Sequence, residues 1–412
     1  MDKKLMRNFI WNTIGTTLAS FNSLFFMIII TRINGLEDAG IFSITFATAS
    51  LLYIFAIYSG RNGQITDVKN EINDKEYMVS RIITCLLAIV IMIVMVALNQ
   101  YDNWKNSILI CLCIWKFLEA FADVFYAILQ KKEELYRVGI SLILKSVLGL
   151  IIFFLIDLVT KNLLYACLSL IVVSILVMLC YDIPQVRKRM DKNEKVRKEN
   201  LLKIYQGEFY LFANTFLLMY ILNAPKYAIE SYLTDEVQAI FGIILMPASI
   251  IPLFSQFVMA PIIRKMTDQY KENKIQQMKQ LDHKMTQMII GFGLLATAIG
   301  YFIGIPVLNL LYHRNLDVYR MNLVIILLGY ILYAAGYIKT ISLTIFRNRK
   351  ELFFVHAFVA ILILIISNVA VKYFGMDGAS VTYIFAMATY YLVFMWITRR
   401  KYQQKQEEAN ES

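Results

Sequence analysis

Three ionisable side chains interrupt an apolar segment that is long enough to form one membrane-spanning helix. The segment 108–129 reads ILICLCIWKFLEAFADVFYAIL and contains Lys116, Glu119 and Asp123. An ionised group near the centre of a bilayer costs about 2.5 to 3.5 kcal/mol on insertion scales, so such residues usually face a partner or a water-filled cavity and mark a transport path. Spacings of three and four residues place all three on one helical face. The lysine could hold an anion there, and the carboxylates could exchange a cation.

Two more lysines, Lys145 and Lys339, lie within predicted spans, one in each half of the chain. At about 1.5 Å of rise per residue, Asp123 lies roughly 9 Å from its helix end and both lysines roughly 10 Å from theirs. One interpretation is structural: Lys116 pairs with Glu119, Asp123 pairs with Lys145, and these pairs only hold helices together. The other is functional: Lys145 and Lys339 face a shared cavity in which two cations could hold a diphosphate.

The two carboxylates allow a further pair of interpretations. Glu119 and Asp123 could take up a proton or Na⁺ on one side of the membrane and release it on the other, which would couple transport to an ion gradient. They could equally serve only as counter-ions for the lysines.

The composition indicates that these residues belong to a polytopic integral membrane protein. Hydrophobic residues make up 58% of the 412 positions and gather in long runs. With about 20 residues per span, an all-α fold of twelve transmembrane helices is expected. The predicted spans are 10–31, 40–58, 82–98, 108–129, 138–156, 162–181, 208–224, 240–261, 285–304, 321–346, 352–371 and 378–398.

The net charge of +11 follows the topology. If the N-terminus is cytoplasmic, most of the 41 Lys and Arg fall in inside segments, so the positive-inside rule predicts that both termini are cytoplasmic. Basic segments lying against an anionic leaflet explain the charge, and nucleic acid is not an expected partner.

Cysteine and histidine predict neither disulfides nor a metal site. The five cysteines all fall within spans, where packing is the expected role, and the three histidines belong to separate segments without metal-ligand spacing. No cofactor and no catalytic residue is expected.

The twelve spans divide into two halves of six. GLEDAGIFSI at 35–44 resembles TDEVQAIFGI at 234–243, and KKEELYRV at 131–138 resembles NRKELFFV at 348–355. These matches fall at equivalent topological places, which predicts parallel repeats with binding at the interface between lobes. The predicted domains are an N-terminal six-helix lobe at 1–181, a basic cytoplasmic linker at 182–207, a C-terminal six-helix lobe at 208–398 and a cytoplasmic tail at 399–412.

Half of the chain's six prolines lie in the predicted span 240–261, at Pro247, Pro252 and Pro261. Each proline lacks a backbone donor and clashes with the preceding turn, so this helix is expected to bend. The bend could flex during alternating access, or it could be a static kink.

Four stretches of the chain resemble the polysaccharide repeat-unit flippases, the Wzx type, of the multidrug/oligosaccharidyl-lipid/polysaccharide exporter (MOP) superfamily. The likeness covers most of the chain and contains no catalytic signature. The stretches are TRINGLEDAGIFSITFA from Thr31, YSGRNGQITDVKNEINDKEYMVSRIIT from Tyr58, KFLEAFADVFYAILQKKEELYRVGISLILKS from Lys116 and NAPKYAIESYLTDEVQAIFGIILMPASIIPLF from Asn223.

The resemblance implies two six-helix bundles around a central cavity in the cytoplasmic membrane. The monomeric protein would move an undecaprenyl-diphosphate-linked oligosaccharide, a precursor of capsule, exopolysaccharide, O-antigen or teichoic acid, to the outer leaflet. Its partners would be this lipid-linked oligosaccharide, membrane lipids and H⁺ or Na⁺ as a coupling ion. Lys116, Lys145 and Lys339 would suit the anionic head of the carrier, and Arg61 and Arg81 in the first cytoplasmic loop could recruit it.

Several alternatives stay open. Arg61 and Asp67 could simply tie the first cytoplasmic loop together. Multidrug and lipid II exporters belong to the same superfamily. A membrane polysaccharide polymerase or glycosyltransferase would be an enzyme, but it would need a sizeable external loop with clustered catalytic residues, which the predicted topology lacks.

Overall fold

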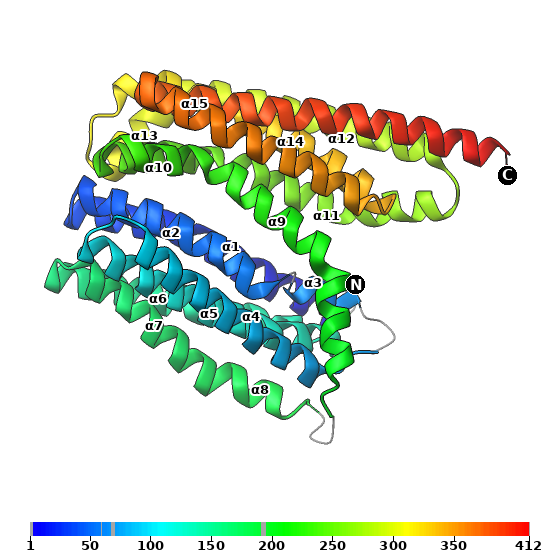
Figure 1. The fold of residues 1–412 in the computed structure, drawn as a ribbon, viewed down its shortest axis with the longest axis horizontal. Helices are drawn as coiled ribbons and strands as arrows, with labels where there is room; N and C mark the ends of the chain where they lie inside the picture. Colours follow the sequence, from blue (N-terminus) through cyan, green and yellow to red (C-terminus); the bar gives the residue numbers. More distant parts are fainter. Residues whose placement is uncertain (1–2, 59, 67–70, 191–194, 412) are drawn as a thin grey trace. The chain divides into compact units, whose positions relative to one another are not determined.

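The computed structural model describes residues 3–58, 60–66, 71–190 and 195–411, and the regular structure in these segments is helical (Figure 1). Contacts within the chain divide it into two compact units, Met1–Phe216 and Leu217–Ser412, which we call unit 1 and unit 2. Unit 1 contains the first six predicted spans, unit 2 contains the last five, and the seventh, 208–224, crosses the boundary. The predicted all-α membrane fold is confirmed.

Unit 1 is a bundle in which six long helices form the predicted spans. The sixth span continues from α7 through a π-helical turn, Met178–Asp182, into α8. The helices are α1 (Lys3–Ile33), α2 (Leu36–Ile57), α3 (Gly60–Thr66), α4 (Asp74–Leu98), α5 (Asn103–Lys131), α6 (Leu135–Thr160), α7 (Leu163–Val177) and α8 (Ile183–Arg187).

Two glycines bring α1 and α6 into close contact. A Cβ atom on Gly15 would lie 2.5 Å from the carbonyl oxygen of Gly139, and a Cβ atom on Gly139 would collide with the carbonyl of Trp11. Small residues at such crossings let helix backbones approach in a membrane, where packing drives association. Several turns further along both helices, the ring of Phe26 on α1 lies 4.7 Å from that of Phe153 on α6. Contacts between α1 and α6 therefore occur at two places several turns apart.

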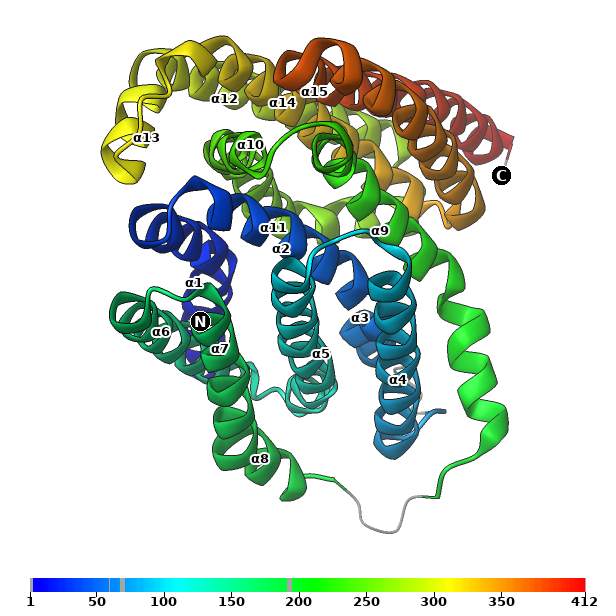
Figure 2. The same cartoon turned by 60° about the vertical axis from the view of Figure 1, so that its left-hand side comes forward.

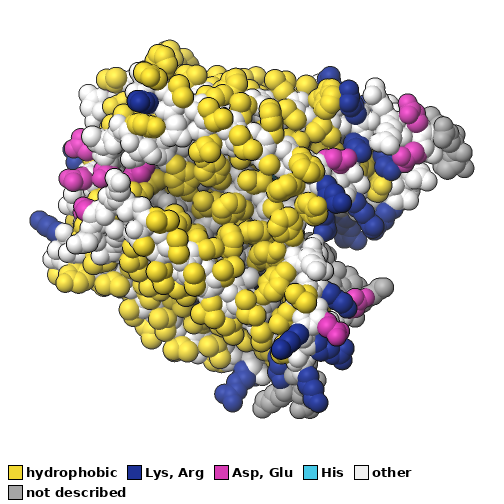
Figure 3. Space-filling view, in the orientation of Figure 1, with side chains coloured by type: hydrophobic (Ala, Val, Ile, Leu, Met, Phe, Trp, Pro, Cys, Tyr) yellow, Lys and Arg dark blue, Asp and Glu magenta, His cyan; other side chains and the backbone are white. Residues whose placement is uncertain are grey.

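The outer surface of the bundle is apolar. Leu86, Val90 and Ile93 follow one face of α4 and are each more than half exposed. Figure 3 shows hydrophobic side chains covering the middle of the helices in each unit, whereas Lys and Arg gather toward the end that carries that unit's terminus. This pattern is that of a multi-pass membrane protein whose apolar surface faces lipid.

Helix α9 (Lys198–Tyr232) belongs to both units, because the boundary between Phe216 and Leu217 falls inside it. Its first half packs on unit 1, where Phe212 stacks on Tyr58 with 4.6 Å between ring centroids. Residues 182–207, predicted as a linker, are thus helical at both ends.

The start of α9 is fastened to the start of α4 by a buried carboxylate. Glu76 completes a capping box with Asn73, and it also accepts hydrogen bonds from the backbone N–H of Arg197 at 2.9 Å and from the side-chain amide of Asn200. A second carboxylate, that of Glu134, accepts hydrogen bonds from two arginines that flank it, Arg137 at 2.9 Å and Arg189 at 2.6 Å. Part of the predicted linker is therefore held by ion pairs and caps.

Unit 2 contains five helices beyond α9, two short turns of helix and a short helix (Figure 2). They are α10 (Asp235–Ala248), α11 (Ile250–Lys271), α12 (Ile275–Ile299), a π-helical turn (Gly300–Gly304), α13 (Ile305–Tyr312), a 3₁₀ turn (Asp317–Tyr319), α14 (Arg320–Ile345) and α15 (Arg349–Glu411).

The predicted span 240–261 is interrupted at Ser249, between Pro247 and Pro252, so that it comprises α10 and the start of α11. Proline at 252 cannot donate to the carbonyl four residues earlier. The amide and the hydroxyl of Ser249 both donate to the carbonyl of Met246, at 3.1 and 2.6 Å, which tightens the last turn of α10. Pro261 lies inside α11, which continues to Lys271.

Helix α15 contains two spans joined at Gly375, whose φ of +58° lies in the left-handed region that favours glycine. The two halves run antiparallel: Lys401 pairs with Glu351 at 3.0 Å, and the ring of His356 lies 5.6 Å from that of Tyr390. The spans predicted at 352–371 and 378–398 are these two halves.

Candidate functional site

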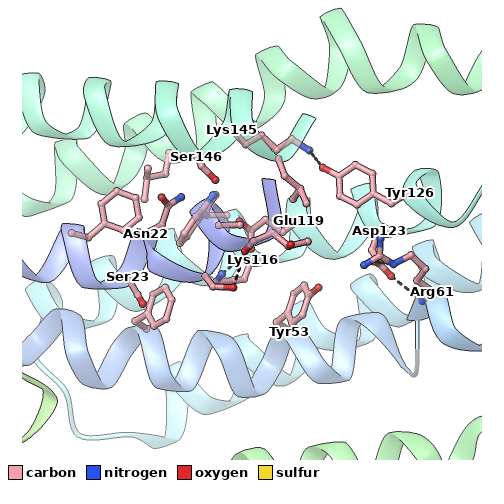
Figure 4. A pocket seen from close by; sticks show the side chains of 18 residues that line it. Asn22, Ser23, Tyr53, Arg61, Lys116, Glu119, Asp123, Tyr126, Lys145 and Ser146 are labelled. Carbon is pink, nitrogen blue, oxygen red and sulfur yellow. Dashed lines mark hydrogen bonds and ion pairs between the residues drawn. The ribbon is translucent and has the colours of Figure 1, made fainter. Parts of the chain in front are cut away.

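A cavity of 440 Å³ lies within the helices of unit 1. Residues of α1, α2, α3, α5, α6 and α7 line it, and it combines aromatic rings with charged and hydroxyl side chains. The polar and charged lining residues labelled in Figure 4 are Asn22, Ser23, Tyr53, Arg61, Lys116, Glu119, Asp123, Tyr126, Lys145 and Ser146.

Lys116 and Glu119 form an ion pair on α5, which is one of the two interpretations that the sequence allows. The Nζ atom of Lys116 lies 2.7 Å from Oε2 of Glu119. The same ammonium lies 4.3 Å from the ring centroid of Trp115 and 5.0 Å from that of Phe46, within the range of cation–π attraction. The lysine is thus held by one carboxylate and by aromatic rings at the cavity wall.

Asp123 faces two arginines. Its Oδ2 atom accepts the backbone N–H of Arg61 at 3.0 Å, and its carboxylate lies 3.7 Å from Nε of Arg61 and 3.5 Å from Nη2 of Arg81. Gly60, with a φ of +57°, packs against this carboxylate, since a Cβ there would lie 2.8 Å from Oδ2. Asp123 therefore joins α5 to the start of α3 and to α4.

Lys145 on α6 pairs with Asp182, the first residue of the predicted linker. Its Nζ donates to Oδ2 of Asp182 at 2.7 Å and to the hydroxyl of Tyr126 at 2.8 Å. Asp182 ends the π-helical turn after α7 and is fully buried. The expected pair between Asp123 and Lys145 is therefore wrong, because Asp123 points to α3 and α4 whereas Lys145 reaches toward α7. Similar depth on consecutive helices did not reveal that the two side chains face different neighbours.

The charged groups at the cavity do not balance. Among the described residues, those that line it or pair with its lining comprise four cations and three carboxylates, so one positive charge is in excess. The cations are Arg61, Arg81, Lys116 and Lys145, and the carboxylates are Glu119, Asp123 and Asp182.

Lys339 lies elsewhere, in a buried polar network of unit 2. It is 7% exposed and donates to Asp282 and, at 2.9 Å, to the hydroxyl of Thr286. Asp282 also accepts a hydrogen bond of 2.6 Å from Ser342, whose hydroxyl is 3.2 Å from that of Tyr402. Asp282 lies between the predicted spans 240–261 and 285–304, so hydropathy does not place it beside Lys339. It can bond to Lys339 because α12 begins earlier, at Ile275.

Two other expectations concern a contact within the first cytoplasmic loop and the presence of a metal site. Asp67, proposed as a partner of Arg61, lies outside the described residues. In the part of the chain that is described, no group of three His, Cys, Asp or Glu side chains could hold a metal ion.

Comparisons with known proteins agree with this architecture. A family model described as polysaccharide biosynthesis protein matches residues 5–267. The capsular polysaccharide biosynthesis protein CapF of Staphylococcus aureus is 22% identical over 385 residues, covering 92% of this chain and 95% of CapF. An inward-facing multidrug resistance MATE family transporter of the MOP superfamily has a TM-score of 0.72 at 12% identity, with 97% of this chain and 99% of that one covered. An outward-facing MATE family transporter has a TM-score of 0.67 at 14% identity, with 98% and 96% covered. The chain thus has the fold of these transporters and belongs to the polysaccharide biosynthesis protein family.

Proposed function

We propose that this protein is a flippase that moves an undecaprenyl-diphosphate-linked oligosaccharide from the inner to the outer leaflet of the cytoplasmic membrane by alternating access. Membership of the polysaccharide biosynthesis family and a transporter fold support movement of a polysaccharide precursor. The observation that carries the proposal is the cavity of unit 1, where the described charged groups have one positive charge in excess, which suits an anionic head group.

The head group would be bound by Lys116, Lys145, Arg61 and Arg81. Hydrogen bonds between charged partners are worth roughly 1.5–3 kcal/mol each, so two or three of them suffice to select a diphosphate over a neutral lipid. Lys145 and Lys339 are both bonded to a buried carboxylate and a hydroxyl, but Lys145 also lines the cavity. Lys339 is not part of that lining, which favours a structural role inside unit 2.

Glu119 and Asp123 are the groups that would couple transport to H⁺ or Na⁺, because they are the carboxylates that line the cavity. In the proposed orientation both termini lie in the cytoplasm, which agrees with the basic residues at the ends of the helices near them. The interruption at Ser249, flanked by Pro247 and Pro252, would give unit 2 a helix that can change its bend.

A second candidate is export of lipid II, whose carrier has the same diphosphate. Export of cationic drugs by the same fold is disfavoured, because a cavity with excess positive charge repels such cargo. Both alternatives differ from the first in cargo, so the test must vary the cargo.

The decisive experiment places purified protein in liposomes that contain a labelled undecaprenyl-diphosphate oligosaccharide, and a membrane-impermeant reagent reports how much label reaches each leaflet. We expect protein-dependent exchange that is lost in the Lys116→Gln/Lys145→Gln/Asp182→Asn variant, in which Asp182 is not left as a buried charge without its partner, so that the protein stays folded. Lipid II and a lipophilic cation serve as competing cargoes in parallel. Exchange of the oligosaccharide lipid at the rate of protein-free liposomes would refute the proposal.

A further inference from the structure

Asp123 stands between the cavity and a buried arginine. Asp123 and Arg61 belong to the cavity lining, whereas Arg81 lies behind them and is only 6% exposed. Arg81 reaches the carboxylate through Nη2 and donates through Nη1 to the carbonyl of Ala56 at 3.3 Å. A ligand in the cavity therefore meets Asp123 before it can meet Arg81.

The contacts between this carboxylate and the two guanidinium groups are loose. Charge-assisted hydrogen bonds are typically 2.7–2.9 Å long. The pairs of Lys116 with Glu119 and of Lys145 with Asp182 are both 2.7 Å, but the arginine contacts of Asp123 are 3.7 and 3.5 Å. One carboxylate is thus shared between two guanidinium groups, neither of which it binds in the paired geometry that arginine favours.

We propose that Asp123 occupies the place of a phosphate group on Arg61 and Arg81 when no cargo is bound, and that a phosphate of the cargo displaces it. This inference rests on the proposed function. A diphosphate carries more charge and more acceptor oxygens than a carboxylate, so it can bind both guanidinium groups at once. The exchange involves no covalent step: one anion replaces another on the same pair of cations.

Such an exchange explains why a carboxylate is useful in an anion site. A flippase must release its cargo as well as bind it, and a site of unopposed arginines would hold a diphosphate tightly. When Asp123 returns to the arginines, it takes over the contacts that the leaving phosphate gives up. The apparent affinity for the phosphate equals the intrinsic affinity multiplied by the fraction of time that the arginines are free. A site that is free one-tenth of the time therefore binds about tenfold more weakly.

The test measures binding of inorganic pyrophosphate to the full-length protein in lipid nanodiscs by calorimetry at constant ionic strength. Asp123→Asn should bind pyrophosphate about tenfold more tightly than wild type, and this gain should disappear when Arg81→Gln is added. Asp74→Asn is the matched control, because this substitution removes the same charge from unit 1. Among the described residues, the ion pair of Asp74 is with Lys131, at 3.9 Å, and not with Arg61 or Arg81. Asp123→Ser replaces the first variant if Asn prevents folding.

Each outcome separates this inference from the proposed function. Equal or weaker binding by both Asp123 variants, or a gain that Asp74→Asn reproduces, overturns the exchange even if wild type transports the lipid. Tighter binding that depends on Arg81, without transport of the oligosaccharide lipid by wild type, supports the exchange and refutes the flippase. Failure of wild type and every variant to bind pyrophosphate counts against both.

Discussion

Replacing Lys339 by Gln is expected to destabilise unit 2 by about 3–5 kcal/mol, the usual cost of leaving one member of a buried ion pair without its partner. The reason lies in Asp282, whose side chain is 4% exposed and would keep the hydrogen bond from Ser342 but lose its only cation among the described ion pairs. At roughly 2–4 °C per kcal/mol for a unit of this size, the midpoint of thermal unfolding should fall by about 6–20 °C. The measurement is thermal unfolding of the purified protein in detergent.

The double variant Asp282→Asn/Lys339→Gln distinguishes a structural pair from a cargo site. Both charges are then absent, and the two amides can still bond to Thr286 and Ser342, so the cost should be only about 1–2 kcal/mol. We therefore expect the double variant to be about 2–3 kcal/mol more stable than Lys339→Gln alone, together with transport close to that of wild type. As a control, Lys401→Gln breaks the more exposed pair with Glu351, and it should change stability by less than about 1 kcal/mol.

Two results would refute this reasoning about Lys339. A single variant as stable as wild type would mean that the pair contributes nothing to folding. A double variant that is stable but does not transport would show that Lys339 contacts the cargo, as its position within a predicted span first suggested.

Three further changes test other contacts of unit 1. Burial alone would raise the pKa of the Glu134 carboxyl, but hydrogen bonds and charge from two arginines outweigh it and hold the pKa below its usual range. The stability that this carboxylate contributes is thus present at neutral pH and lost as the pH falls through the lowered pKa, so the difference in Tm between wild type and Glu134→Gln should vanish in acid. Gly60→Ala should lower the free energy of unfolding by about 1–2 kcal/mol, seen as a lower Tm, because φ at Gly60 is positive and the Asp123 carboxylate leaves no room for a Cβ atom. Gly207→Ala, where a Cβ atom would meet open space, should leave the Tm unchanged. Glu76→Gln should accelerate hydrogen exchange in the first turn of α9, because the Glu76 carboxylate accepts a hydrogen bond from Asn200 in that turn. Unchanged exchange there would contradict the role of Glu76 in holding α9 to α4.

Hydropathy predicts the twelve spans well because lipid imposes a simple requirement of length and apolarity on each helix. The pair of Lys116 with Glu119 is also predictable, since residues three apart on one helix are neighbours. Partners on other helices are not predictable in this way. Lys145 binds Asp182 because a π-helical turn carries the end of α7 to it, and one sequence gives no sign of that turn.

The predicted linker, 182–207, shows a second limit of prediction from the sequence. Its basic residues look like a linker, yet from Lys198 onward the chain is helical and continues without interruption into the next span. Charge density marks where a helix leaves the apolar layer, but it does not mark where the helix begins. The fastening of this helix by Glu76 depends on residues 121 and 124 positions apart, a separation that no local pattern reports.

The continuity of α9 bears on how a transporter with this fold could work. Because the boundary between the units falls within this one helix, any change in the relation of unit 1 to unit 2 must bend α9 or shift its packing on one of them. Its first turn is held to α4 through Glu76, and the ring of Phe212 stacks on Tyr58, so the half in unit 1 resists shifting. Pro225, in the half that belongs to unit 2, removes one backbone hydrogen bond and makes bending easier there. Bending of α9 would therefore concentrate in its second half, where the helix has lost a hydrogen bond at Pro225.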